Sequence, residues 1–280
     1  MVDRLQALLQ RFSVSARMFH SGPLCGIHDF AEIPGCGQLH LVRRGPVEAR
    51  HGTHAPVQIE VPSVIFYPRP LAHRFITDAR VGADMVCANI SLSAGADNPI
   101  TRALPSVVVL PLADVRSAEP ALDLLFEEAF AQRCGRQQLI DRLFEAVLIL
   151  ILRALIDRGG MDQGLMAGLA HPQLAKALVA MHETPAHAWS LEQLATCAGM
   201  SRSHFAAVFA QTVGITAGEY LARHRIALAQ DLMSRGVPLK RVVDEVGYGS
   251  SAALSRAFRA ICGQSPRAWK EALGASIIAR

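Results

Sequence analysis

The sequence of 280 residues has no long hydrophobic run. Its longest uninterrupted apolar stretch, Ala146–Leu152, stops at Arg153, whereas a helix that crosses a bilayer needs about 20 apolar residues. The N-terminus also lacks the apolar centre of a secretory signal, because Asp3, Arg4 and Arg11 interrupt its first turns. These absences predict a cytoplasmic protein without a membrane span.

Cysteine is scarce as well: six cysteines are scattered through the chain, and no two of them form a CxxC pair. This pattern excludes a disulfide framework and indicates core thiols or site ligands in a reducing compartment. Charged residues make up 19% of the chain and apolar residues 51%, which excludes a chain too polar to fold. The length favours two domains, each large enough to bury a core.

The first part of the chain, residues 20–93, is typical of an all-β domain. Apolar stretches of strand length alternate with turns rich in Gly, Pro and His; these stretches are Leu39–Val42, Val57–Val61, Val64–Tyr67 and Met85–Leu92. Many short strands with close turns predict a barrel or jelly roll, whose interior can hold a ligand. From Pro120 to Asp157 the apolar residues recur every three or four positions, which predicts two helices. The second of these helices is apolar on nearly all sides, so we expect it to be buried against the barrel or another subunit.

Residues 158–171 are rich in small residues and are interpreted as a linker. Beyond them the apolar pattern is helical throughout. We therefore expect an α+β protein, with a β-barrel and two helices over residues 1–157 and an all-α domain over residues 172–280.

The helical part contains an internal repeat. Residues 190–199 align with residues 238–247, and the match continues beyond the turn with one residue inserted. Each copy is a helix closed by glycine, a short turn, and a second helix that Ser201 or Ser250 can cap. This is the pattern of a helix-turn-helix unit. Matched pairs include Leu191 with Leu239, Gly199 with Gly247, Phe205 with Leu254 and Phe209 with Phe258.

The second helix of each copy carries apolar anchors on one face and small or polar residues on the other. Such a helix can enter the major groove with its N-terminal half near the base edges. Between the copies, Thr216–Ser234 has helical spacing and would span roughly 28 Å. That spacer can hold the two reading helices about one DNA turn, roughly 34 Å, apart. The candidate DNA contacts are Ser201, Arg202, Ser203, His204, Ser250, Ser251, Arg256 and Arg259.

The charge distribution supports a polyanionic partner for this part of the chain. Residues 190–270 hold ten Lys or Arg against five Asp or Glu, while the rest of the chain is nearly neutral. A basic third on a near-neutral body indicates that this third meets a polyanion. Helix pairs of this kind also occur in proteins that never touch DNA, but two copies on a basic background favour double-stranded DNA as the partner.

Four short motifs lie in residues 172–272: Ser190-Leu191 with Gly199-Met200-Ser201, the stretch from Glu219-Tyr220-Leu221 to Arg225-Ile226, Val246-Gly247-Tyr248, and Gly263-Gln264-Ser265-Pro266. Together they resemble the DNA-binding domain of AraC-type transcriptional regulators. The resemblance implies that Ser203 and Arg256 contact DNA. Ala206 and Ala207 depart from it, because many relatives carry Gln, Arg or Lys there. The first motif is therefore expected to rely more on phosphate contacts and DNA shape.

The N-terminal part carries a looser motif. Pro68-Arg69-Pro70-Leu71-Ala72-His73 follows the strand Val64–Tyr67 and is similar to the second motif of cupins. The resemblance implies a cupin-like jelly-roll barrel that senses an effector. We find no His-x-His with a downstream Glu on one strand, the arrangement with which cupin enzymes hold iron or manganese, and this argues against an enzyme.

Cys25, His40, His73 and Cys87 are candidate zinc ligands, because two thiolates and two imidazoles complete a tetrahedral shell. The branch of the family with a Gly-x-x-Cys-Gly opening and a cysteine on the late strand is implied to use these residues for sensing. Two other interpretations stay open: a metal-free redox pair of thiols, and purely structural roles. Other histidines could replace the predicted ligands, namely His20, His28, His51 and His54.

We therefore expect a transcription factor that binds promoter DNA as a homodimer, with the subunits paired through the helix around Leu139–Leu155. Its barrel would sense a metal, an oxidant or a small organic effector, and the signal would shift the protein between two arrangements. Two alternatives remain. One is a cupin-type metal-dependent enzyme fused to a DNA-binding module, and the other is a DNA-repair alkyl acceptor with a reactive cysteine.

Overall fold

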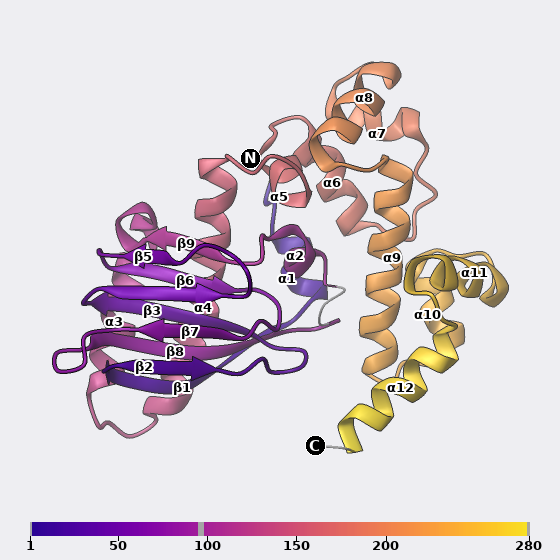
Figure 1. The fold of residues 1–280 in the computed structure, drawn as a ribbon. Helices are drawn as coiled ribbons and strands as arrows, with labels where there is room; N and C mark the ends of the chain where they lie inside the picture. The colour runs from indigo at the N-terminus through magenta and orange to yellow at the C-terminus, as the bar shows by residue number, and fades with distance from the viewer. Residues whose placement is uncertain (1, 95–97, 279–280) are drawn as a thin grey trace. The chain divides into compact units, whose positions relative to one another are not determined.

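The computed structural model describes residues 2–94 and 98–278, and the chain divides into two compact units. We call Val14–Ala96 with Leu104–Arg158 the barrel unit, and Met1–Ser13 with Asp97–Ala103 and Gly159–Arg280 the helical unit. Figure 1 shows that the strands gather in the first unit and that the second is helical. The predicted fold class, a β domain followed by an all-α domain, is confirmed.

The barrel unit contains two antiparallel sheets whose facing residues form one core. One sheet has the strand order β1-β8-β3-β6-β9, and the other has the order β2-β7-β4-β5. The core joins residues of both sheets, among them Leu24, Val42 and Met85 from the first and Val47 and Phe75 from the second. The strands are β1 (Val14–Leu24), β2 (Ile27–Phe30), β3 (Gly37–Arg44), β4 (Val47–His51), β5 (Val57–Ile59), β6 (Ser63–Tyr67), β7 (His73–Ile76), β8 (Ala83–Leu92) and β9 (Val108–Pro111).

Helices α3 (Glu119–Phe130) and α4 (Arg136–Arg158) complete the barrel unit, as the apolar periodicity predicts. Helix α4 packs on β1 and on α3. Its Asp141 carboxylate accepts a hydrogen bond from the backbone N–H of Met18 at 2.7 Å, which fixes the helix against the strand. The expected burial of this helix is only partial within this chain, since Leu139 remains 41% exposed. Two short 3₁₀ turns, Leu112–Asp114 and Arg116–Ala118, precede α3.

The helical unit gathers segments from three parts of the chain. Its helices are α1 (Gln6–Arg11), α2 (Pro99–Ala103), α5 (Leu165–Ala170), α6 (Leu174–Glu183), α7 (Leu191–Ala198), α8 (Arg202–Val213), α9 (Ala217–Ser234), α10 (Leu239–Val246), α11 (Ser251–Cys262) and α12 (Pro266–Ile278). Among the described residues, no helix is both long and apolar enough to span a bilayer.

The two compact units divide the chain differently from the predicted domains in three places. Residues 1–13 and 97–103 belong to the helical unit, and α5 lies inside the segment interpreted as a linker. The reason for the first difference is packing: Leu8 and Phe12 are fully buried, and α1 contacts α6. The Arg11 guanidinium donates hydrogen bonds to the carbonyls of His182 and Glu183 at 3.0 and 2.9 Å. It thereby places a cation at the C-terminus of α6, where the helix dipole favours it.

Candidate functional site

The first helix-turn-helix motif consists of α7 and α8. The Ser190 hydroxyl accepts a hydrogen bond from the N–H of Gln193, and the Gln193 side chain accepts one from the N–H of Ser190, so a capping box opens α7. Gly199 ends α7 in the left-handed region with φ 65°. The Ser201 hydroxyl then accepts from the N–H of His204 and opens α8. These caps fix the turn between the two helices.

The second motif, α10 and α11, is built the same way. Gly247 ends α10 with φ 76°, and the Ser250 hydroxyl accepts a hydrogen bond from the N–H of Ala253 at 3.1 Å to open α11. A side chain at position 247 would collide with the backbone of Ala186. Only glycine fits this close approach, so the second turn depends on Gly247 for space as well as for conformation.

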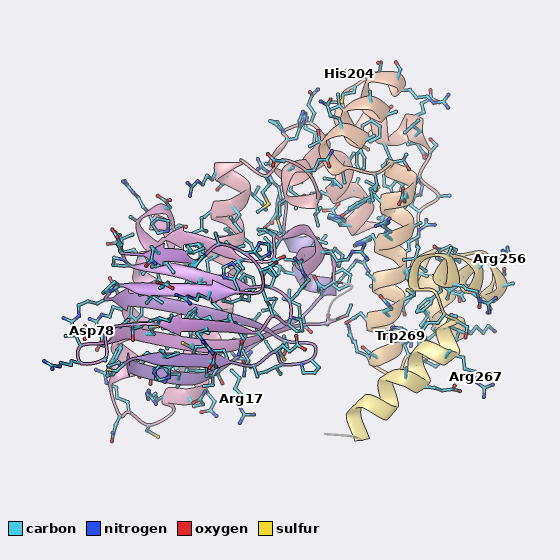
Figure 2. All side chains as sticks on the ribbon, in the orientation of Figure 1. Arg17, Asp78, His204, Arg256, Arg267 and Trp269 are labelled. Atoms are coloured by element: carbon cyan, nitrogen blue, oxygen red, sulfur yellow. The ribbon has the colours of Figure 1, made fainter. Side chains whose placement is uncertain are left out.

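We call α8 and α11, the second helices of the two motifs, the reading helices. Each is held to the core by two aromatic or aliphatic side chains and exposes its polar face. Phe205 and Phe209 on α8, and Leu254 and Phe258 on α11, are fully buried. Every predicted DNA contact is exposed, namely Ser201, Arg202, Ser203, His204, Ser250, Ser251, Arg256 and Arg259. Figure 2 shows the labelled His204 and Arg256 at the outer edge of the helical unit, on α8 and α11.

The arginines of the reading helices differ from the other arginines of this unit in their partners. Four arginines elsewhere in the unit form ion pairs with an acid four residues away: Arg223 with Glu219, Arg235 with Asp231, Arg241 with Glu245, and Arg267 with Glu271. Arg225 donates hydrogen bonds to the carbonyls of Pro185 and His187. Within residues 2–94 and 98–278, no ion pair or hydrogen bond is formed by the side chains of Arg202, Arg256 and Arg259. Their guanidiniums are therefore available for phosphates or base edges.

Helix α9 connects the two motifs (Figure 1). It has 18 residues, which corresponds to roughly 27 Å, and it contacts α8, α10, α11 and α12. Twelve of its residues are buried, so it serves as the core of the helical unit and not as an isolated spacer. The predicted separation of the reading helices by one DNA turn stays a prediction.

In the barrel unit, two of the predicted zinc ligands meet. The Nε2 atoms of His40 on β3 and His73 on β7 are 3.0 Å apart. The ring of Tyr67 stacks on His73 with centroids 3.9 Å apart, and the ring of Phe30 also stacks on His73, with centroids 5.0 Å apart. This cluster of His40, His73, Tyr67, Phe30 and Phe75 is called the barrel histidine cluster below.

Burial keeps both imidazoles neutral. Desolvation lowers the pKa of His73 to about 4 and that of His40 well below its usual value. The Nδ1 atom of His73 lies 2.8 Å from the carbonyl oxygen of Leu71; because a carbonyl only accepts, this nitrogen carries the proton. His40 must then donate from its Nε2 to His73, which leaves its Nδ1 as an unprotonated acceptor. No partner for that buried Nδ1 occurs in the described part of the chain.

The two predicted cysteine ligands lie in different surroundings. Cys87 on β8 is the register partner of His40 on β3 and is fully buried, and burial raises the pKa of its thiol. Cys25 is exposed in the turn between β1 and β2. Across the residues that the structure describes, no three or more His, Cys, Asp or Glu side chains are placed to hold one metal ion. His40 and His73 are in contact and Cys87 lies beside His40 on the neighbouring strand, whereas Cys25 is exposed in a turn; the four-ligand zinc site stays a prediction.

The sequence did not reveal the aromatic part of this cluster. Tyr67 is fully buried, and its hydroxyl has no hydrogen-bond partner among the described residues. The alternation of side chains along β6 could have indicated it: Tyr67 lies two residues after Ile65, so both side chains point to the same, inward side of the sheet. Of the alternative histidine ligands, His51 stands 5.8 Å from Tyr67 between ring centroids.

Comparisons with known proteins agree with this architecture. The cupin family matches residues 3–157, and a helix-turn-helix domain matches residues 194–272. A putative AraC-like transcription regulator of Streptomyces antibioticus is 35% identical over 94% of this chain and 95% of its own length. The RCS-specific transcriptional activator RclR of Escherichia coli is 25% identical over 85% of this chain and 87% of its own. The DNA-binding domain of AdpA, solved with a target DNA, is 28% identical over 38% of this chain and 95% of that domain, with a TM-score of 0.35.

The matches to relatives cover nearly the whole chain, and these relatives are named as regulators of transcription and not as enzymes. The predicted double motif and the predicted cupin-like barrel are both confirmed by the family matches. The chain belongs to the AraC-like transcription regulators: it is a DNA-binding regulator with an N-terminal cupin domain.

Proposed function

We propose that the protein recognises promoter DNA by placing α8 and α11 in two successive major grooves. The observation that carries this proposal is the contrast among the arginines of the helical unit. Arg202, Arg256 and Arg259 have no acidic partner among the described residues, whereas four arginines outside the reading helices are paired. Arg256 and Arg259 lie on α11 and can form bidentate bonds to guanine or to phosphate. On α8, Ser203, His204 and the small Ala207 contribute shape and phosphate contacts more than charge.

The test is a selection of DNA fragments from a random-sequence pool by the full chain, followed by footprinting of the enriched sequence. We expect two protected segments about one helical turn apart. Binding should weaken steeply as salt rises, because several cations displace counterions from the phosphates. Failure to enrich any sequence at low salt would refute the proposal. Because a regulator of transcription must reach the chromosome, we also propose a cytoplasmic location.

We propose further that the barrel histidine cluster senses the signal that controls DNA binding. An unprotonated His40 Nδ1 and the Tyr67 hydroxyl are both buried without a partner in the described part of the chain, and such groups cost free energy unless they have a role. A neighbouring buried thiol, Cys87, is the register partner of His40. The candidate signals are an oxidant, a metal ion and a small organic effector.

Two measurements separate these signals. Metal analysis of protein purified without chelators should find about one metal per chain if His40 and His73 are ligands. If the signal is an oxidant, oxidation should change operator binding reversibly, and Cys87→Ser should remove that change while leaving binding by the reduced protein intact. Irreversible loss of a thiol on exposure to methylated DNA would instead indicate the alkyl-acceptor alternative.

We propose that the protein pairs as a homodimer through α4. Leu139 is 41% exposed, and Leu143, Ala146 and Leu150 on the same helix are half-buried. Their spacing places all four on one face. Light scattering should report a dimer for the wild type and a shift to monomer for Leu139→Glu. The control is Val81→Glu, because Val81 is a 79% exposed residue of the same unit and lies in a turn. Equal masses for the two variants would contradict the proposal.

A further inference from the structure

The helical unit contains a cavity of about 190 Å³ that the DNA-binding mechanism does not use. Residues of α2, α5 and α9 and the segment that joins α8 to α9 line it. Most of the wall is apolar, with Pro99, Leu165, Val213, Ile215 and Ala227 among its members. A dry apolar cavity of about 150 Å³ accepts benzene in an engineered protein. The volume here therefore fits one aromatic ring with a small substituent.

One polar side chain in the wall of this cavity is buried without a partner. His224 on α9 is only 2% exposed, and neither of its ring nitrogens has a hydrogen-bond partner among residues 2–94 and 98–278. The adjacent His182 does not supply one: its Nε2 is engaged with the Tyr220 hydroxyl at 2.6 Å, and its buried Nδ1 has no partner either within the described residues. Burial lowers the pKa of His224 to about 3, so its ring is neutral and presents one donor and one acceptor.

A buried donor and a buried acceptor without partners both destabilise the folded protein. The rings beside it are those of Phe12, His182 and Tyr220, with centroids 5.9, 4.8 and 6.4 Å away, and within the described residues none of them forms a hydrogen bond with it. A polar ligand in the cavity would supply a hydrogen-bond partner for this imidazole.

The charges along the cavity select the type of ligand. Arg102 on α2 and Arg223 on α9 both contribute to the lining. Arg223 is half-buried and holds the exposed Glu219 carboxylate at 2.6 Å. Guanidiniums keep their charge at any physiological pH and bind carboxylates through paired N–H donors. Among the residues that the structure describes, the lining holds two guanidiniums and no carboxylate, and Arg223 shares its charge with the neighbouring Glu219 in the ion pair above. The cavity therefore favours an anion with an apolar body.

We propose that this cavity binds a small organic acid whose apolar body is about the size of one aromatic ring. Its carboxylate would meet Arg102 and Arg223, and a polar atom of the acid would supply the partner that His224 lacks. Occupation of the cavity would act on DNA binding, because α9 contacts both motifs. Helix α2 is also joined along the chain to β8 and β9 of the barrel unit. The inference rests on the DNA-binding function above and adds to it a ligand site outside the barrel.

The experiment uses the full chain with benzoate and phenylacetate as probes and benzyl alcohol as the uncharged comparison. Binding is followed by calorimetry and by saturation-transfer NMR. We expect a saturable site for at least one acid, with the alcohol at least tenfold weaker. Ala103→Leu fills the cavity and should weaken acid binding at least tenfold, as should Arg223→Gln.

Two matched variants control for nonspecific effects. Ala222→Leu adds the same volume at a half-buried position of α9 that does not line the cavity, and Arg241→Gln breaks the same type of ion pair elsewhere. Both should bind the acid like the wild type. Absence of saturable binding by either acid at millimolar concentration would overturn the inference, and so would binding that Ala103→Leu and Arg223→Gln leave unchanged.

Operator binding is measured separately on the same proteins. The acid should change the affinity of the wild type for its selected DNA at least threefold, and it should have no effect on Ala103→Leu. If no DNA is bound with or without the acid, the proposed recognition mode fails, and the calorimetry still decides whether the cavity binds acids. If DNA is bound and no acid binds, only the cavity inference fails.

Discussion

Replacing Gly247 by alanine should destabilise the helical unit far more than the same change at Gly199. Both glycines end a helix in the left-handed region, where an L residue costs about 1–2 kcal/mol. A Cβ at position 247 would lie 2.5 Å from the carbonyl oxygen of Ala186, whereas a Cβ at position 199 would meet nothing within 4 Å. Because a backbone carbonyl cannot rotate aside like a side chain, the change at Gly247 adds about 1–3 kcal/mol of overpacking.

Tryptophan fluorescence measures this difference in one unit of the protein. Trp189 and Trp269 are the only tryptophans of the chain, and both lie in the helical unit. With a denaturant slope of about 2 kcal/mol per molar urea, an extra 2 kcal/mol moves the unfolding midpoint by about 1 M. The midpoint of Gly247→Ala should therefore lie about 1 M below that of Gly199→Ala. Equal midpoints would refute the reasoning that the approach of Ala186 excludes a side chain.

Three further predictions concern charge and thiols. Arg256→Ala should weaken operator binding by about 1–3 kcal/mol if the residue contacts a base. Arg267→Ala should weaken it much less, because Arg267 forms an ion pair with Glu271. Equal losses of affinity in an anisotropy titration would remove Arg256 from the interface. Acidification should destabilise the barrel unit, because the pKa of His73 is about 4 in the folded protein and 6.5 in the unfolded chain. The contribution of neutral His73 to the free energy of unfolding is fully present above pH 6.5 and is lost as the pH falls toward 4. The loss amounts to about 2 kcal/mol between pH 7 and 5. Urea titrations followed by circular dichroism of the strands would test this, and a flat profile would contradict it. A thiol reagent should label the exposed Cys25 within seconds. It should label Cys87 only when the protein unfolds, because that thiol is buried and its pKa is raised. Equal labelling rates by mass spectrometry would show that Cys87 is accessible.

The double motif was predictable because its signals are local. Gly199 and Gly247 end their helices in left-handed conformation, and Ser201 and Ser250 cap the helices that follow. Each of these roles depends on a few adjacent residues, so a single sequence carries it. The repeat supplied a second copy of every signal and made the assignment firmer.

The placement of residues 1–13 could not be predicted in the same way. Leu8 and Phe12 could pack in any apolar core, and the residues next to them in the sequence do not indicate that they pack with α6 and His224 and not in the barrel. The barrel histidine cluster shows the same limit. Residue types alone suggested His40 and His73, but register and barrel closure decide that they meet and that Cys25 lies exposed in a turn.

The sequence does predict which arginines of the proposed DNA interface lack an acidic partner. A helical arginine can form an ion pair with an acid four residues away, and this is the case for Arg223, Arg235, Arg241 and Arg267. On the reading helices the corresponding positions are small or uncharged: Ala206 for Arg202, Ala252 and Ala260 for Arg256, and Ser255 and Gly263 for Arg259. Ala206 thus has a positive role although it departs from the family pattern, because an acid there would pair with Arg202 and withdraw it from DNA. The prediction is that Ala206→Glu weakens operator binding as much as Arg202→Ala does, whereas Ala206→Gln leaves it nearly unchanged. Similar losses for the Glu and Gln variants in an anisotropy titration would mean that side-chain size at this position matters and charge does not.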